Sequence, residues 1–179
     1  RHTLICPDWL STLPTEQLLS GFSEMLKNAI LSDETEWNRL LAYDLDTFET
    51  PSLAPRISCS LAIKEAIVAT DPHEEGLRKA LNFGHTFGHA LEALSEGQIA
   101  HGYAVVYGMI AELYLSVTLL GCPKEPLQQM TQLMLHYYGR PQCNCKDRER
   151  LIAFMLQDKK NERAAEINCT LLHKIGEPI

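Results

Sequence analysis

Four polar side chains between residues 78 and 89, in RKALNFGHTFGH, could act together. On an α-helix at about 100° per residue, Arg78, Asn82, His85 and His89 would share one stripe about 60° wide. A cation, an amide and two imidazoles make poor core material, because each would need its own buried partner. The pattern favours a binding or catalytic face. A solvated helix face, or histidines bonded only to backbone groups, remains the alternative.

A carboxylate elsewhere in the chain could complete a metal site with such imidazoles. Glu24 and Lys27 stand three residues apart in GFSEMLK, where they could also form an ordinary salt bridge on one helix face. His101 begins another predicted helix, as a cap or as a ligand. A catalytic zinc takes three protein ligands and keeps one position open. Glu24, His85 and His101, from three different helices, are sufficient for such a site.

The charge balance restricts the partners of the protein. The chain has 179 residues and a net charge of −7, from 23 acidic and 16 basic residues. A nucleic-acid partner is therefore not expected. Any anion must be held by a local group of basic side chains, for which the candidates are Lys27, Lys64, Arg78, Lys159 and Lys160.

The elements that would position these residues are mainly helical. Apolar residues recur at intervals of three or four residues over most of the chain, and a short alternating run predicts one strand at 166–173. Pro51 and Pro55 indicate a loop before the third helix. The expected helices lie at about 14–30, 34–46, 57–69, 75–95, 102–120, 124–138 and 147–157.

The composition, with 45% hydrophobic and 22% charged residues, is that of a folded globular domain. Six irregularly spaced cysteines and no signal peptide favour free thiols in a cytoplasmic protein. Cys143 and Cys145 lack the second pair that a structural zinc site needs. We expect no membrane span, because no apolar run appears long enough. The chain begins with Arg1 and has no glycine-rich nucleotide loop, which suggests a piece of a longer protein.

The segment LNFGHTFGHALE, residues 81–92, resembles the signature helix of the 3-dehydroquinate synthases. The resemblance extends to GFSEMLK at 21–27, to Asp71…Glu74-x-Gly76-x-Arg78, to HGYAVVYGM at 101–109 and to DKKN at 158–161. It implies that residues 1–179 form a single, mainly α, multi-helical C-terminal domain of the dehydroquinate synthase-like fold, with at most a short strand or two. The N-terminal, Rossmann-like NAD-binding half would be absent from this sequence.

The resemblance also implies a role for each matching residue. Glu24, His85 and His101 would bind the metal, and Glu74 would be a carboxylate outside the ligand set. The family usually reads His-Gly-Glu where this chain has Tyr103, which could alter the support of a ligand or mark a subfamily with another sugar phosphate.

The remaining matches would contact the substrate. Lys64 and Arg78 would grip its carboxylate, Lys27 its ring hydroxyls, and His89 its phosphate as a partner or proton relay. The lysine of the DKK motif is assigned to Lys159, with Lys160 as the second choice. The expected catalytic residues are thus Lys27, His89 and Lys159, and the expected substrate-binding residues are Lys64, Arg78, Asn82 and Lys160.

The implied enzyme is a lyase of the shikimate pathway, which supplies aromatic amino acid biosynthesis. It converts 3-deoxy-D-arabino-heptulosonate 7-phosphate to 3-dehydroquinate and phosphate. NAD⁺ oxidises a ring alcohol transiently, phosphate leaves, the hydride returns, and an intramolecular aldol step closes the ring. The resemblance implies zinc or cobalt, NAD bound mainly by the other half, a cytoplasmic homodimer, and little or no turnover by this chain alone.

Two other functions stay open at this point. One is a related enzyme, either a sugar-phosphate cyclase such as 2-deoxy-scyllo-inosose synthase or a metal-dependent alcohol dehydrogenase. Lys64 and Arg78 argue for a carboxylate that inosose-type substrates lack. The other is a non-catalytic helical module that binds a metal or a phosphorylated ligand, or only dimerises.

Overall fold

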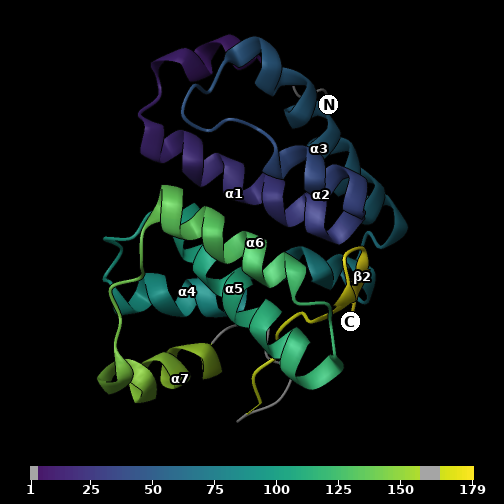
Figure 1. The fold of residues 1–179 in the computed structure, drawn as a ribbon. Helices are drawn as coiled ribbons and strands as arrows, with labels where there is room; N and C mark the ends of the chain where they lie inside the picture. The colour runs from purple at the N-terminus through teal and green to yellow at the C-terminus, as the bar shows by residue number, and fades with distance from the viewer. Residues whose placement is uncertain (1–3, 158–165) are drawn as a thin grey trace.

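A computed structural model describes residues 4–157 and 166–179, and in these residues the fold is mainly α (Figure 1). Helices α1, α2 and α3 lie together in the upper half of that view, and α4, α5 and α6 lie below them. The α-helices are α1 (Thr15–Ser32), α2 (Glu34–Leu41), α3 (Thr50–Thr70), α4 (His85–Leu94), α5 (His101–Leu120), α6 (Glu125–Leu133) and α7 (Arg148–Leu156). The other elements are the 3₁₀-helices η1 (Pro7–Thr12), η2 (Leu77–Asn82) and η4 (Cys145–Asp147), the π-helix η3 (Met134–Tyr138), and the strands β1 (Leu172–Lys174) and β2 (Glu177–Pro178).

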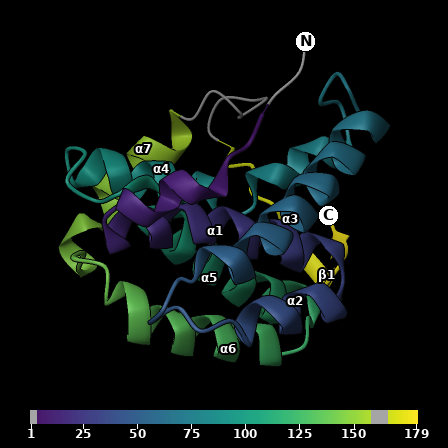
Figure 2. The same ribbon diagram turned by 90° about the horizontal axis from the view of Figure 1, so that it is seen from above.

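The central helix is α5, which packs against α1, α4 and α6 (Figure 2). Val105, Met109 and Leu113 are fully buried on it, and the core continues into the apolar face of α1. By length and hydropathy alone α5 could cross a membrane, which the sequence interpretation did not expect. Its burial among three other helices accounts for this apolar composition.

The crossing of α4 and α5 depends on glycines. A Cβ at Gly108 would collide with the carbonyl oxygen of Gly84, and one at Gly88 would lie 3.1 Å from the carbonyl oxygen of Ala104. At Gly84 and Gly88 the backbones of the two helices therefore approach each other closely. This approach brings the first turns of α4 and α5 together.

The expected helix at 75–95 is broken, which corrects the prediction of one continuous polar stripe. Residues 77–82 form the 3₁₀-helix η2, and α4 begins only at His85. Between them Gly84 has a φ of 79°, a left-handed conformation that glycine adopts without a side-chain clash. The Gly84 N–H donates to the buried Glu112 carboxylate at 2.7 Å, which fixes the break from α5.

The start of α3 also differs from the prediction. The helix begins at Thr50, so Pro51 lies in its first turn and Pro55 lies inside it. A proline in the first turn costs no hydrogen bond, and Pro55 removes one bond from a helix of 21 residues. Reading both prolines as loop residues was therefore wrong. The second helix ends at Leu41, five residues before the expected end.

The strand expected at 166–173 begins only at Leu172, where it pairs with β2 in an antiparallel hairpin. Residues 166–171 form no strand, although Leu171 exchanges backbone hydrogen bonds with Ile179. The hairpin turn at Gly176 donates to Ile30 of α1, and Leu172 N–H donates to Ser116 of α5. The helices expected at 14–30, 102–120 and 147–157 are confirmed in type and approximate position, whereas the one expected at 124–138 is α6 only as far as Leu133 and continues as the π-helix η3. All six cysteines are free thiols.

Candidate metal centre

Glu24 from α1, His85 from the start of α4 and His101 from the start of α5 converge. Glu24 Oε1 lies 3.4 Å from His85 Nε2 and 3.7 Å from His101 Nε2. One donor atom from each of the three residues lies within 4.8 Å of the other two. The sequence-predicted trio is thus brought together, with two imidazole nitrogens facing one carboxylate oxygen.

The donor set fits a divalent cation. Glu24 Oε1 is buried and accepts no hydrogen bond from a described residue, whereas Glu24 Oε2 accepts one from Lys27 Nζ at 2.7 Å. A buried oxygen without a partner is costly, and a cation between it and the two nitrogens would remove that cost. Burial alone would raise the pKa of Glu24, but His85 and Lys27 outweigh it and hold that pKa well below its ordinary value. The carboxylate is therefore ionised, as a metal ligand must be.

The hydrogen bonds of the two imidazoles orient the same ring nitrogen toward Glu24. His85 Nδ1 lies 3.1 Å from the Phe83 carbonyl oxygen, and His101 Nδ1 lies 2.9 Å from Glu92 Oε1. Since a carbonyl or a carboxylate can only accept, these contacts assign the proton to Nδ1 and leave the Nε2 lone pair available. Burial, together with the charge of Lys27, lowers the pKa of His85 and favours its neutral, ligating form.

His89 lies one turn after His85 on α4 and belongs to the same histidine cluster. Its ring centroid is 5.4 Å from that of His85 and 6.1 Å from that of His101. With Glu92 and His101 it forms a second group whose donor atoms lie within 4.8 Å of one another. Glu92 belongs to the signature segment 81–92, but the family resemblance assigns it no role. Its position three residues after His89, on the same helix face, was the available signal.

Arg78 and Asn82 form a separate group that is held by Glu74. Asn82 Nδ2 donates to Glu74 Oε1 at 3.3 Å, and Arg78 Nε lies 3.8 Å from Glu74 Oε2. Arg78 Nη1 also donates to the Pro72 carbonyl at 2.8 Å. Among the described residues, the Glu74 carboxylate thus contacts these two side chains and not the metal cluster.

Asp71 organises the loop that carries this group. Its carboxylate accepts backbone N–H bonds from Gly76 at 2.7 Å and from Glu75 and Arg78 at 3.1 Å. The bond from Gly76 is the largest of the causes that lower the pKa of Asp71. The loop from 71 to 78 is therefore folded around its own carboxylate.

Of the other positions that the sequence analysis singled out, the structure describes Lys64 and Tyr103. Lys64 is exposed on α3, and Lys159 and Lys160 lie outside the described residues. Tyr103 packs its ring against Tyr138, with centroids 4.9 Å apart. Two residues after His101 on α5, it projects from another side of the helix.

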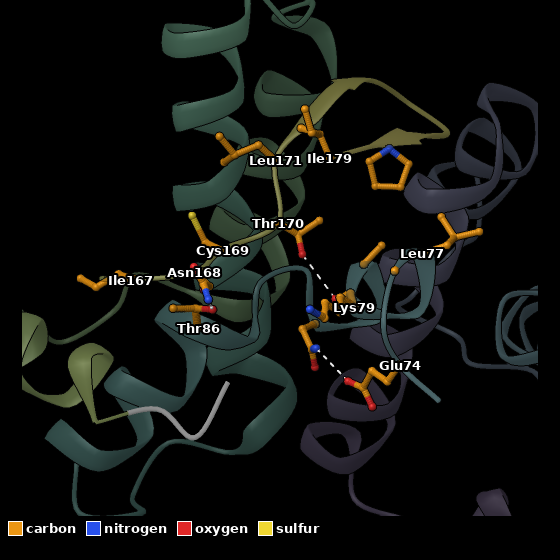
Figure 3. Close-up of a pocket in the computed structure, with 14 residues that line it drawn as sticks. Glu74, Leu77, Lys79, Thr86, Ile167, Asn168, Cys169, Thr170, Leu171 and Ile179 are labelled. Carbon is orange, nitrogen blue, oxygen red and sulfur yellow. Dashed lines mark hydrogen bonds between the residues drawn. The ribbon is translucent and has the colours of Figure 1, made fainter. Parts of the chain in front are cut away.

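A cavity of about 880 Å³ lies between η2 and the chain that leads into β1 (Figure 3). Glu74, Asn82, Thr86 and residues 167–171 are among the residues that line it. Burial, together with the charge of Glu112, raises the pKa of the Cys169 thiol in this lining to about 11. This cysteine is therefore protonated near neutral pH and is a poor nucleophile.

Comparison with solved structures identifies the fold. A 2-deoxy-scyllo-inosose synthase, solved with carbaglucose-6-phosphate, NAD⁺ and Co²⁺, matches with a TM-score of 0.79 at 21% identity, over 97% of this chain and 49% of the other. A second 2-deoxy-scyllo-inosose synthase structure matches with a TM-score of 0.72, over 94% of this chain and 46% of the other. The chain thus has the helical fold found in about half of each of these two structures.

Sequence comparison then defines the family. The family model "3-dehydroquinate synthase C-terminal" matches residues 21–161, and the chain belongs to this family. A 3-dehydroquinate synthase of Parabacteroides distasonis is 43% identical over 95% of this chain, and one of Listeria monocytogenes is 39% identical over 96%. The chain spans about half the length of these relatives, 49% and 47%.

Proposed function

We propose that this chain is the metal- and substrate-binding domain of a 3-dehydroquinate synthase. The observation that carries the proposal is the convergence of Glu24, His85 and His101 around a buried, unsatisfied carboxylate oxygen, in a chain of this family. Residues 1–179 act as one domain in the proposal, and NAD binds mainly to a half outside this sequence. The parent is then a cytoplasmic, homodimeric carbon–oxygen lyase of the shikimate pathway.

Glu24, His85 and His101 would hold zinc or cobalt. When bound, such an ion lowers the pKa of an alcohol that it contacts, and NAD accepts the hydride. The chain's own part is to hold the three donors in place before substrate arrives. Lys27 fixes one oxygen of Glu24 at 2.7 Å and so leaves the other directed at the two imidazoles.

The ring of His89 borders the metal cluster, at 6.1 Å from His101 between centroids. It would contact the substrate phosphate or pass a proton to it rather than serve as the sole base. Lys27 would reach ring hydroxyls, and Lys159, with Lys160 as the second choice, would bind the phosphate. These roles are assigned because each residue stands at the matching position of a family motif.

Lys64 and Arg78 would bind the substrate carboxylate, and Asn82 would bind near the phosphate. Glu74 would orient the last two, since it contacts both Arg78 and Asn82. A guanidinium recognises a carboxylate through two parallel hydrogen bonds, so Arg78 must turn part of its fork toward the substrate. This group positions the substrate and takes no part in bond breaking.

The test is an assay of the parent protein that carries this chain behind its NAD-binding half. With NAD⁺ and Co²⁺ it should release phosphate from 3-deoxy-D-arabino-heptulosonate 7-phosphate, and the 179-residue chain alone should not. The 2-deoxy-scyllo-inosose synthase likeness favours one rival, which a hexose 6-phosphate without a carboxylate would test. Preference for that substrate would replace the proposed function with a related cyclase activity. Turnover of neither substrate would contradict both.

A further inference from the structure

Glu92 and His101 connect the end of α4 to the start of α5. Glu92 lies in the last turn of α4, His101 is the first residue of α5, and Glu92 Oε1 lies 2.9 Å from His101 Nδ1. In this hydrogen bond the ring N–H donates and the carboxylate oxygen accepts. The contact therefore assigns Nδ1–H to His101 and turns Nε2 toward Glu24, 3.7 Å away.

The two candidate histidine ligands differ in how they are held. The His85 side chain is 12% exposed and bonds to a backbone carbonyl, so packing and the main chain fix its ring. The His101 side chain is 47% exposed. Within the described part of the chain, its ring is held by a hydrogen bond to the Glu92 side chain, which is itself 27% exposed. The orientation of His101 thus depends on a side chain that a single substitution can remove.

His101 is also common to both groups of potential metal donors, Glu24–His85–His101 and His89–Glu92–His101. Glu24 and Glu92 lie on opposite sides of its ring, because Nε2 faces Glu24 and Nδ1 faces Glu92. While Glu92 accepts the Nδ1 proton, that nitrogen has no lone pair for a metal, so the second group cannot bind an ion through Nδ1. The same hydrogen bond thus leaves Nε2 as the ring nitrogen that can bind a metal beside Glu24.

We propose that Glu92 is a positioning residue that holds His101 in the tautomer and orientation needed for a metal ion at Glu24 and His85. It is not itself a metal ligand. The proposal rests on the proposed metal site and adds a residue that the family resemblance did not assign. Carboxylates that orient a histidine ligand typically change metal affinity about 10–100-fold when removed.

The first experiment measures Co²⁺ affinity of the 179-residue chain by competition with a chelator. Glu92→Ala should weaken binding about 10–100-fold, and Glu92→Gln, which keeps a neutral acceptor, should weaken it less. The matched control is Glu96→Gln, because Glu96 is exposed just beyond the same helix and loses the same charge. Its affinity should stay within about twofold of wild type. Equal losses at positions 92 and 96 would reduce the effect to overall charge and overturn the proposal.

The second experiment uses the unmodified chain, so it does not depend on a variant that folds. Nitrogen-15 NMR of the imidazoles with bound Zn²⁺ should show His101 protonated at Nδ1 and bound to the metal through Nε2. Metal at Nδ1 would overturn the proposal and favour the group with His89. Binding by wild type with unchanged affinity in both Glu92 variants would contradict only the role of Glu92. No binding by wild type would contradict the metal site itself.

Discussion

The metal cluster and the segment from Asp71 to Asn82 are built by different means. The cluster takes its residues from three helices, and the tight crossing of α4 and α5 sets their positions. The loop is organised from within: Asp71 accepts its backbone N–H groups, and Glu74 holds Arg78 and Asn82. Long-range packing thus fixes the proposed chemistry, and short-range hydrogen bonds fix the proposed substrate contacts.

The difference has consequences for stability. A group placed by helix packing is lost only when the core is disturbed, because its backbone belongs to the most buried part of the fold. A loop held by its own hydrogen bonds can loosen while the core stays folded. Substitutions in the two regions should therefore separate metal binding from substrate binding.

The largest effect is expected for Gly108→Ala. The added Cβ would collide with the Gly84 carbonyl oxygen, so α4 and α5 must move apart. We expect a loss of about 3 kcal/mol in the free energy of unfolding, together with most of the metal affinity. Gly21→Ala is the control, because nothing lies within 4 Å of its Cβ in α1. That change should stabilise the chain by up to about 1 kcal/mol in urea titrations. Equal stability of the two variants would show that the crossing is not tight.

A smaller and more local effect is expected for Glu74→Ala. It frees Arg78 and Asn82 from their shared partner without touching the helices that carry the metal cluster. In the parent protein KM should rise about tenfold, since a positioning contact is lost (~1.4 kcal/mol per tenfold). Co²⁺ affinity of the chain should stay within about twofold of wild type. A large fall in Co²⁺ affinity would mean that Glu74 supports the metal cluster. The two regions would then not be independent of each other.

The smallest effect is expected for the pH dependence of the loop. The folded pKa of Asp71 lies below its ordinary value of 3.8, because the carboxylate accepts backbone N–H bonds. The stabilisation is therefore present above that value and is lost as the pH falls through the lower, folded pKa. Amide exchange at Gly76 should be slower in wild type than in Asp71→Asn at pH 6, and the two should converge as the pH falls below about 4. A difference that persists in acid would mean that the charge of Asp71 is not what orders the loop.

Most of the helices and the three candidate metal ligands could be predicted from the sequence. The contacts between helices that hold those ligands in place could not. Periodicity indicated α1 and α5, and the residue types of Glu24, His85 and His101 indicated a metal site. The break before α4 was missed because helical periodicity continues through Phe83 and Gly84. The hydrogen bond that fixes the break is donated by the Gly84 N–H to the carboxylate of Glu112, 28 residues later. Glu92 was missed for a similar reason, because its partner lies on the next helix.

The two prolines also show that single residues do not determine where a helix begins. Pro51 and Pro55 are poor helix residues taken singly, but α3 is long enough to accommodate the one lost hydrogen bond. The strand near the C-terminal end was predicted to begin too early. Alternation of apolar and polar residues does not reveal where the pairing strand begins. Its partner is β2, which pairs only with the last residues of the predicted run.

The most direct test of the central claim is the metal content of the purified 179-residue chain, measured by mass spectrometry after incubation with Zn²⁺ and removal of unbound metal. We predict about one zinc per chain in wild type, and almost none in folded His85→Ala, His101→Ala and Glu24→Gln variants. Glu16→Gln, an exposed carboxylate on the same helix as Glu24, should retain the full amount. Full zinc content in any of the three ligand variants would remove that residue from the site. No zinc in the folded wild-type chain would contradict a metal site formed by this domain.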